Sequence, residues 1–209
     1  MSQASFTGLV PSTLGNLSNL EYLDLGKYPS TKLLWVSDLN WLSSLSSLHA
    51  FGLRGIDLSK AINSWLQVVD MLPTLWSLQL LDCQLHNSPQ SHPFVNSTSL
   101  FILDLSYNNF NSPIPEYLFN ISTLSLLRLK KCELSGSISK VPWGNLPDLF
   151  LLDLSSNKLS GNVHDSLGYL GNLRSLNLRD NSIVGPLPRK FVTVGRSRPT
   201  FEHDGWDYS

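Results

Sequence analysis

The sequence predicts an α/β solenoid, in which short strands form one parallel sheet and short helices or 3-10 turns cover its other side. Leucine supplies 42 of the 209 residues, and seven of these leucines recur in phase, 24 to 28 residues apart. These anchors are Leu20, Leu48, Leu75, Leu100, Leu124, Leu149 and Leu173. After each anchor, apolar and polar residues alternate as they do in a strand with one buried face. Because one such strand is too short to be stable alone, neighbouring copies must stack and share a core.

The composition excludes several classes of protein. Fifteen Lys+Arg against 16 Asp+Glu give a formal net charge of -1, so no strong field favours nucleic acid. Charged residues make up 15% and apolar residues 42%, which is too apolar for a disordered chain. No uncharged apolar run approaches the ~18 residues of a membrane span. The first ten residues, MSQASFTGLV, lack the features of a signal peptide.

A small polar residue stands eight positions after several anchors. It is Asn108, Asn157 or Asn181 in three copies, and we expect these buried amides to bond the backbone of their own and the next coil. Cys83 and Cys132 occupy the same position. They lie two strands apart, about 9–10 Å, whereas a disulfide needs Cα atoms within about 7 Å. The sequence therefore predicts two buried free thiols.

A second pattern follows this position, with a glycine that permits a tight bend and, in some copies, a proline that directs an extended exit. Its copies begin at Phe6, Phe110, Leu134, Leu159 and Ile183, as in Leu134-Ser-Gly-Ser-Ile138. The combined motif resembles the plant-specific class of leucine-rich repeat. That resemblance implies a right-handed leucine-rich-repeat solenoid of about seven or eight coils, with the sheet on its concave face.

Two early segments depart from this motif. In 58–69, apolar residues recur at intervals of three and four, which predicts an amphipathic helix, and 33–42 are interpreted in the same way. The stretch 41–85 resembles the N-terminal part of plant receptor-like proteins, most of all the receptors that perceive a fungal xylanase. The resemblance covers about 6–188. It implies a cell-surface, extracellular recognition module in defence signalling, with a protein or peptide ligand and a co-receptor.

The resemblance also sets the expected domain organisation. Residues 1–188 are predicted to form the solenoid, and 189–209 carry no repeat and are expected to be a tail. Members of this family have a signal peptide, a cysteine-paired cap, more repeats and a transmembrane helix. Because the sequence shows none of these, we expect the chain to be a fragment or a truncated product.

The concave sheet face is the predicted binding surface. Strand residues that alternate with the buried leucines face outward, and they combine an apolar stripe with flanking charges, which suits protein or peptide recognition. The predicted ligand contacts are Tyr22, Asp24, Ile102, Asp104, Leu126, Arg128, Lys130, Leu151, Asp153, Asn177 and Arg179. The alternative is that these side chains only pack against one another across strands.

Three Asn-x-Ser/Thr sequences predict N-glycosylation at Asn16, Asn96 and Asn120. Each asparagine lies four residues before an anchor, so the glycans would follow one edge and leave the strands bare. Asn145 shares this position without the acceptor sequence, which shows that the repeat itself favours asparagine there.

The sequence offers little support for catalysis. Its five histidines have no metal-ligand spacing, and nucleophile, phosphate-loop and kinase motifs are absent. We therefore expect no enzyme activity, cofactor or metal, and we interpret Glu202-His203-Asp204 as part of a solvated terminus. Most of the tryptophans are expected to fill coil interiors, as Trp143 does where other coils have leucine.

Two other functions remain open. Plant polygalacturonase inhibitors share this repeat type, so a secreted inhibitor of microbial cell-wall hydrolases is one alternative; the 27- and 28-residue spacings favour the receptor. The other alternative is a truncated product without independent function.

Overall fold

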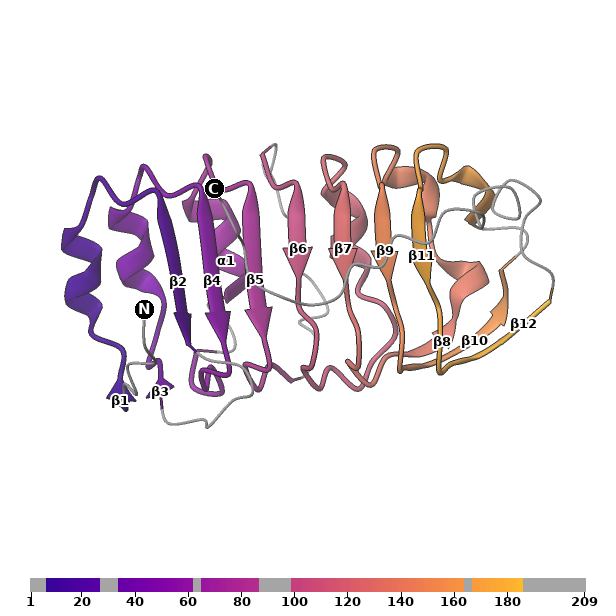
Figure 1. Ribbon diagram of the computed structural model, residues 1–209, viewed down its shortest axis with the longest axis horizontal. Coiled ribbons are helices and arrows are strands. Elements are labelled where there is room, and N and C mark those ends of the chain that lie inside the picture. Colours follow the sequence, from indigo (N-terminus) through magenta and orange to yellow (C-terminus); the bar gives the residue numbers. More distant parts are fainter. Residues whose placement is uncertain (1–6, 27–33, 62–64, 87–98, 164–166, 186–209) are drawn as a thin grey trace.

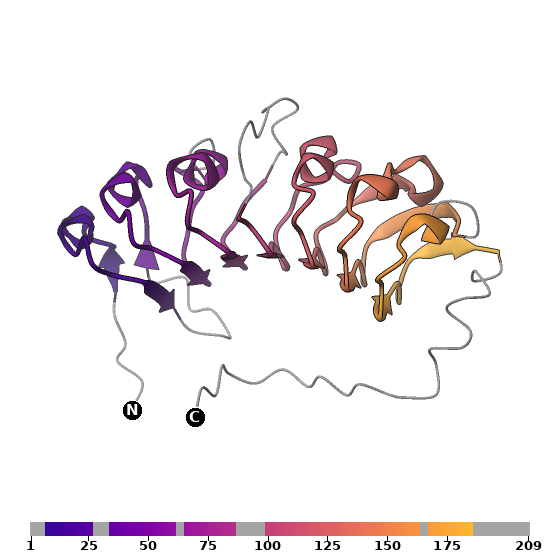
Figure 2. The same ribbon diagram turned by 90° about the horizontal axis from the view of Figure 1, so that it is seen from above.

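The computed structural model describes residues 7–26, 34–61, 65–86, 99–163 and 167–185. Seven parallel strands of these residues lie side by side in one sheet, in the order of the chain (Figure 1). The strands are β2 (Tyr22–Gly26), β4 (Ala50–Arg54), β5 (Ser77–Leu81), β6 (Ile102–Asp104), β7 (Leu126–Arg128), β9 (Leu151–Asp153) and β11 (Ser175–Asn177). Figure 2 shows the sheet along the inner, concave side of an arc and the helices along its outer side. The predicted solenoid is confirmed.

All seven strands share one register, which confirms the phase expected from the leucine period. The first outward row runs without a slip through Tyr22, Ala50, Ser77, Ile102, Leu126, Leu151 and Ser175. The second outward row runs through Asp24, Gly52, Gln79, Asp104, Arg128, Asp153 and Asn177. Because strand side chains alternate, the residues between these rows point into the core.

Short helices cover the convex side. They are the 3-10 helices η1 (Ser12–Asn16), η2 (Asn40–Ser44), η3 (Glu116–Asn120), η4 (Ile138–Lys140), η5 (Trp143–Asn145) and η6 (Leu167–Tyr169), and one α-helix, α1 (Trp65–Met71). Pro11 and Pro115 stand directly before η1 and η3, and their carbonyls accept the first i+3 hydrogen bonds at 3.2 Å. A proline is tolerated there because the first N–H of a helix has no intrahelical partner.

The structure corrects the two helix predictions for the early segments. The helix expected over 58–69 occupies Trp65–Met71, and Ala61 instead closes a turn by donating to the Leu58 carbonyl. The helix expected over 33–42 is wrong. Leu34–Trp35 form a short strand, β3, and Asp38 then accepts the Asn40 N–H at 3.0 Å, so that only a 3-10 turn follows.

The core is a stack of apolar layers, one layer from each coil. Six of the seven anchor leucines belong to it, with Leu20 packed against it from the N-terminal end. Trp65 and Trp143 are its largest buried side chains and leave 1% of their surface exposed. Trp143 therefore fills the leucine position of its coil, as predicted.

A row of asparagine amides holds successive coils together. The Asn108 Oδ1 accepts hydrogen bonds from the Cys83 and Leu85 N–H groups, both at 3.0 Å, and its Nδ2 donates to the Leu80 and Leu105 carbonyls, both at 2.7 Å. Asn157, two coils further on, bonds in the same way, and Asn181, three coils further on, makes three of the four bonds. The prediction of a bonded amide row is confirmed, but its direction was wrong, because each amide reaches back to the preceding coil.

Cys83 and Cys132 lie in this row as buried free thiols, as predicted. The Cys83 Sγ donates to the Leu53 carbonyl at 3.3 Å, and the Cys132 Sγ donates to the Leu105 carbonyl at 3.2 Å. Each sulfur thus makes the contact to the preceding coil that an asparagine makes elsewhere. Burial raises the pKa of each thiol to about 12.

Both thiols should resist alkylation in the folded protein. The reactive species is the thiolate, which is nearly absent at pH 8 when the thiol pKa is about 12. We expect iodoacetamide at pH 8 to leave both cysteines unmodified in buffer and to modify both in urea, as measured by mass spectrometry of the intact chain. Modification in buffer at the rate found in urea would contradict the buried placement.

The same pKa shift predicts that the fold weakens in alkali. A thiol titrates near pH 8.5 in the unfolded chain and near 12 in the fold. Its contribution to stability is therefore complete below about pH 8.5 and is lost as the pH rises towards 12.

A second set of strands lies at the edge of the coils, where the predicted glycine bends occur. β1 (Gly8–Leu9) pairs with β3 (Leu34–Trp35), and β8 (Ser135–Ser137), β10 (Lys158–Asn162) and β12 (Ser182–Val184) form a three-stranded sheet. Gly161 has a φ of +92°, and a Cβ there would lie 2.3 Å from the Ser137 hydroxyl oxygen. The bend therefore requires glycine both for its backbone angle and for space.

Candidate functional site

The candidate site is the concave face, whose central feature is an apolar row. Ile102, Leu126 and Leu151 stand side by side on β6, β7 and β9, and each is partly exposed. On the other side of each strand, Leu103, Leu127 and Leu152 are buried. The outward placement predicted for the three residues is confirmed. Tyr22, at the N-terminal end of the same row, is 59% exposed and stacks on His49 with ring centroids 6.4 Å apart.

The second row carries charges that pair across the strands. Arg54 lies 3.5 Å from Asp24, and Arg128 lies 3.6 Å from Asp104. The Asn177 Nδ2 donates to the Asp153 Oδ2 at 3.2 Å. Asp24 and Asp104 thus each have an arginine partner, whereas the hydrogen-bond partners of Asp153 are neutral, so the row presents ion pairs and amides with an excess of negative charge.

Gly52 provides the space that one of these ion pairs needs. A Cβ at this position would lie 2.9 Å from an oxygen of the Asp24 carboxylate. Gly52 stands opposite Asp24 in the register, so any side chain there would displace the carboxylate from Arg54.

The structure corrects the placement of Asp104. It stands in the outward row as predicted, but it is only 4% exposed, so it is barely available to a ligand. Arg128 lies beside Asp104, and the Asp104 Oδ1 accepts the Ser106 N–H at 3.0 Å. Burial raises the pKa of the Asp104 carboxyl above its ordinary value, although the hydrogen bonds from Ser106 and the charge of Arg128 oppose the shift.

Asp104→Asn should stabilise the fold at neutral pH. A carboxyl whose pKa is raised on folding favours the folded state most when it is protonated, and this advantage is lost as the pH rises through the folded pKa. The variant should therefore gain stability over the wild type between pH 3 and pH 7, as measured by urea unfolding. Asn177 already holds this position in β11 and accepts the Arg179 N–H, so an amide suits the geometry.

The matched control for this prediction is Asp153→Asn. Asp153 stands in the same row and accepts an equivalent N–H, from Ser155 at 2.9 Å, but it is only partly buried. We expect a smaller change there. A loss of stability in Asp104→Asn that is equal at pH 3 and pH 7 would contradict the prediction.

A third row, two residues further along, contains the remaining predicted cations. Arg179 is exposed, and Lys130 is partly exposed, with its Nζ 5.6 Å from the centre of the Tyr107 ring. Ser106 and Ser155 of this row, which strand alternation places outward, are each 3% exposed. The Ser106 Oγ accepts the Lys130 N–H at 3.2 Å, which draws the serine beneath the next coil.

Sequence reasoning missed a row at the strand starts. A chain of backbone hydrogen bonds links the residues that directly follow the anchors, from His49 through Trp76, Phe101 and Ser125 to Phe150 and Arg174. Phe101 and Phe150 are each 49% exposed. The available signal was the size of the residues after the anchors, since a solenoid needs no aromatic side chain there for its core.

The structure describes two of the three predicted glycosylation sites, and both side chains are exposed. Asn16 and Asn120 are exposed, at the last residues of η1 and η3 on the convex side. Asn96 lies outside the described residues. Glycans on Asn16 and Asn120 would thus project from the helical side and leave the concave face open.

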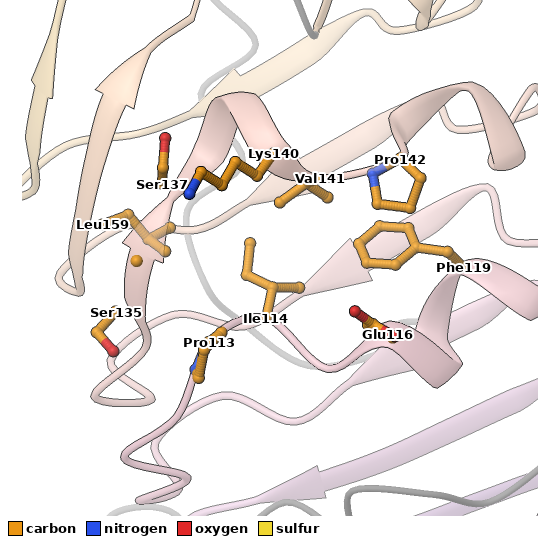
Figure 3. Close-up of a pocket in the computed structure, with 11 residues that line it drawn as sticks. Pro113, Ile114, Glu116, Phe119, Ser135, Ser137, Lys140, Val141, Pro142 and Leu159 are labelled. Atoms are coloured by element: carbon orange, nitrogen blue, oxygen red, sulfur yellow. The ribbon is translucent and has the colours of Figure 1, made fainter.

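A pocket of about 310 Å³ lies away from the concave face, between the coils that contain η3 and η4. In Figure 3, Val141 and Pro142 line one side, Ile114 and Pro113 line the other, and Phe119 lies at one end. Trp143 stands five positions after Ile138, whereas Leu118 stands four positions after Ile114, so the coil on one side of the pocket has one extra residue here.

In the described part of the chain, the histidine, cysteine and acidic side chains form no group of three that could hold a metal ion. None of the helices in this part has both the length and the apolar character to cross a bilayer.

The repeats are similar to those of known proteins. The family model described as Leucine Rich Repeat matches residues 99–121, 148–170 and 172–193. Receptor-like protein EIX1 of Solanum lycopersicum is 36% identical over 127 residues, which are 59% of this chain and 12% of that protein. The chain therefore spans a small part of the curated relative that it matches.

Two solved structures have the same architecture. The ectodomain of the Arabidopsis thaliana receptor kinase GASSHO1/SCHENGEN3, in complex with CASPARIAN STRIP INTEGRITY FACTOR 2, is 29% identical, with a TM-score of 0.66 over 88% of this chain and 21% of that one. The Arabidopsis receptor kinase HAESA, in complex with the peptide hormone IDA and the co-receptor SERK1, is 27% identical. Its TM-score is 0.65 over 89% of this chain and 30% of that one.

Proposed function

The chain belongs to the leucine-rich-repeat receptor-like proteins of plants, and from this premise we propose that it recognises a protein or peptide ligand through its concave sheet face. The observation that carries the proposal is the partly exposed apolar row Ile102, Leu126 and Leu151, held at fixed spacing by three paired strands. A stripe of this kind on a soluble surface is typical of a binding site.

Recognition here would use a preformed surface. The strands of the sheet hold their outward side chains about 4.8 Å apart, and the ion pairs of the second row fix the charged side chains between them. Little conformational freedom is then lost on binding, which favours affinity for a given contact area.

The relatives suggest the setting of this recognition. The solved ectodomains are those of plant membrane and peptide-hormone receptors, and one is in complex with both a peptide and a co-receptor. By that likeness, the chain would act on the extracellular side of the plasma membrane, in defence signalling, as a non-enzymatic module that needs a co-receptor partner. The predicted contacts are Tyr22, Asp24, Ile102, Leu126, Arg128, Lys130, Leu151, Asp153, Asn177 and Arg179, with Asp104 supporting Arg128 rather than meeting the ligand.

A secreted inhibitor of microbial cell-wall hydrolases is the second candidate, because it would use the same repeat architecture. Adding the purified chain to a polygalacturonase separates the two functions. Inhibition at equimolar protein would favour the inhibitor, whereas unchanged hydrolysis of pectin would favour the receptor module.

The proposal predicts that ligand binding depends on the concave face. Peptides selected from a phage-displayed random library on the wild-type chain should bind the double variant Leu126→Asp with Lys130→Glu about tenfold more weakly or worse, a loss of about 1.4 kcal/mol. Arg128 is left intact because its guanidinium lies 3.6 Å from the buried Asp104 carboxylate, which a glutamate would repel. Fluorescence anisotropy gives the affinities, and circular dichroism checks the fold.

Two control variants lie on the other side of the solenoid. Tyr169, 74% exposed on η6, and Lys140, exposed on η4, can be changed to serine and glutamate. Both variants should bind the selected peptides as the wild type does. If the selected peptides bind the concave-face variant with the affinity of the wild type, recognition takes place elsewhere and the proposal is wrong.

A further inference from the structure

The concave face changes in character from the strand starts to the strand ends. Over four coils, the row after the anchors and the first outward row contain no charged residue. Their large members are Trp76, Phe101, Phe150, Ile102, Leu126 and Leu151. We call these six residues the apolar band. Phe101 and Phe150 are half-exposed, and the aliphatic members are partly exposed, so the band meets solvent along the strand starts.

The strand ends carry cations. Lys130 and Arg179 stand two coils apart in the third row, with Ser155 between them. We call these three residues the cationic row, after the two charged members. Ser155 is only 3% exposed, and among the residues that the structure describes its Oγ has no hydrogen-bond partner. Ser106 shows what this position does elsewhere, because its Oγ accepts the N–H of the next coil. At Ser155 the corresponding N–H, from Arg179, goes to Asn177 instead.

Between the apolar band and the cationic row lies the second outward row, whose charged side chains already have partners within the sheet. Asp104 pairs with Arg128, and Asp153 accepts hydrogen bonds from Ser155 and Asn177. This middle row can lie under a peptide backbone, because its amide and charged groups can exchange hydrogen bonds with backbone N–H and C=O groups.

From these three rows we propose that the face binds an extended peptide segment that crosses the strands, with apolar side chains alternating with acidic ones. The backbone would lie over the middle row. Alternate side chains of an extended chain point in opposite directions, so the apolar ones would meet the apolar band and the acidic ones would meet the cationic row. This inference rests on the proposed function and adds the chemistry of the ligand to it.

The length of the apolar band agrees with this arrangement. Side chains on one side of an extended peptide recur every ~6.8 Å, so three of them span about 14 Å. Four coils at ~4.8 Å spacing, from Trp76 to Phe150, span about 14 Å as well. Phenyl rings contribute large apolar contact areas for aliphatic or aromatic partners, which suits Phe101 and Phe150 at the strand starts.

The test uses three blocked peptides at concentrations where light scattering shows them to be monomeric. One alternates leucine and glutamate, one alternates leucine and lysine, and one has the composition of the first with its glutamates grouped at one end. Fluorescence anisotropy with the wild-type chain should show the alternating acidic peptide bound at least about tenfold more tightly than the other two. Added salt should reduce its advantage over the lysine peptide.

Charge reversal provides the second arm. Lys130→Glu and Arg179→Glu should each weaken the binding of the acidic peptide and strengthen the binding of the lysine peptide. Lys140→Glu, on the convex side, should change neither affinity. Arg179 is exposed, so its variant keeps the test valid if Lys130→Glu does not fold. Phe150→Ser should weaken the binding of both alternating peptides equally, because it removes apolar contact and no charge.

The outcomes separate this inference from the proposed function. A wild-type chain that binds the peptides without regard to their charge or their order overturns the inference. If none of the three binds while library-selected peptides still require Leu126 and Lys130, the inference fails and the proposed function stands. If the selected peptides also ignore those residues, both fail.

Discussion

Asn108→Leu is expected to cost about 4 kcal/mol or more of the free energy of unfolding, a large share of the stability of a typical domain. The change leaves two buried N–H groups, of Cys83 and Leu85, and two buried carbonyls, of Leu80 and Leu105, without the amide that bonds them. Each unsatisfied buried group costs about 1–3 kcal/mol, and a domain has only about 5–15 kcal/mol to lose. Urea denaturation followed by circular dichroism measures the effect.

The chain itself supplies the matched control for this variant. Cys83 and Cys132 hold the same position in two other coils and bond the preceding coil through sulfur. Asn108→Cys should therefore cost much less than Asn108→Leu, although leucine has the same number of side-chain heavy atoms as asparagine. Equal losses for the two variants would show that packing, and not the hydrogen bonds of the amide, explains the stability.

Trp143→Ala is expected to cost about 3–5 kcal/mol, the range found for removing a buried aromatic side chain. Trp143 is 1% exposed, packs edge-on against Phe119 with ring centroids 5.5 Å apart, and donates its Nε1–H to the Ile138 carbonyl at 3.2 Å. Alanine would leave a cavity between two coils that the fixed strand spacing prevents from closing. Thermal and urea unfolding of the variant measure the loss.

Trp143→Leu distinguishes the cavity from the loss of the repeat pattern. Leu118 and Leu167 fill the equivalent positions of the neighbouring coils and are fully buried. The leucine variant should therefore fold and lose less stability than the alanine variant. A leucine variant as unstable as the alanine variant would show that the indole, rather than any apolar side chain, is required there.

The features that could be predicted from the sequence are those that follow from its period. The register of β6, β7 and β9, and with it the outward placement of Leu126, follows from the alternation of leucine with other residues after each anchor. The free state of Cys83 and Cys132 follows from strand spacing alone. These features depend on geometry that every coil repeats.

The features that could not be predicted depend on contacts between particular side chains. Nothing in the alternation shows that Arg128 and Ser106 would enclose Asp104. The helix expected over 33–42 failed because Trp35 pairs within a strand and Asp38 then bonds the Asn40 N–H, although the apolar spacing of the segment suits a helix. The aromatic residues at the strand starts lie outside the alternating pattern, so a search along the strands passes over them.

The backward reach of the asparagines has a consequence for how the chain is made. The Asn108 amide closes the turn around Cys83, 25 residues earlier, and Asn157 does the same for Cys132. During synthesis, the hydrogen bonds of these two turns can therefore be completed only after the following coil has left the ribosome and docked.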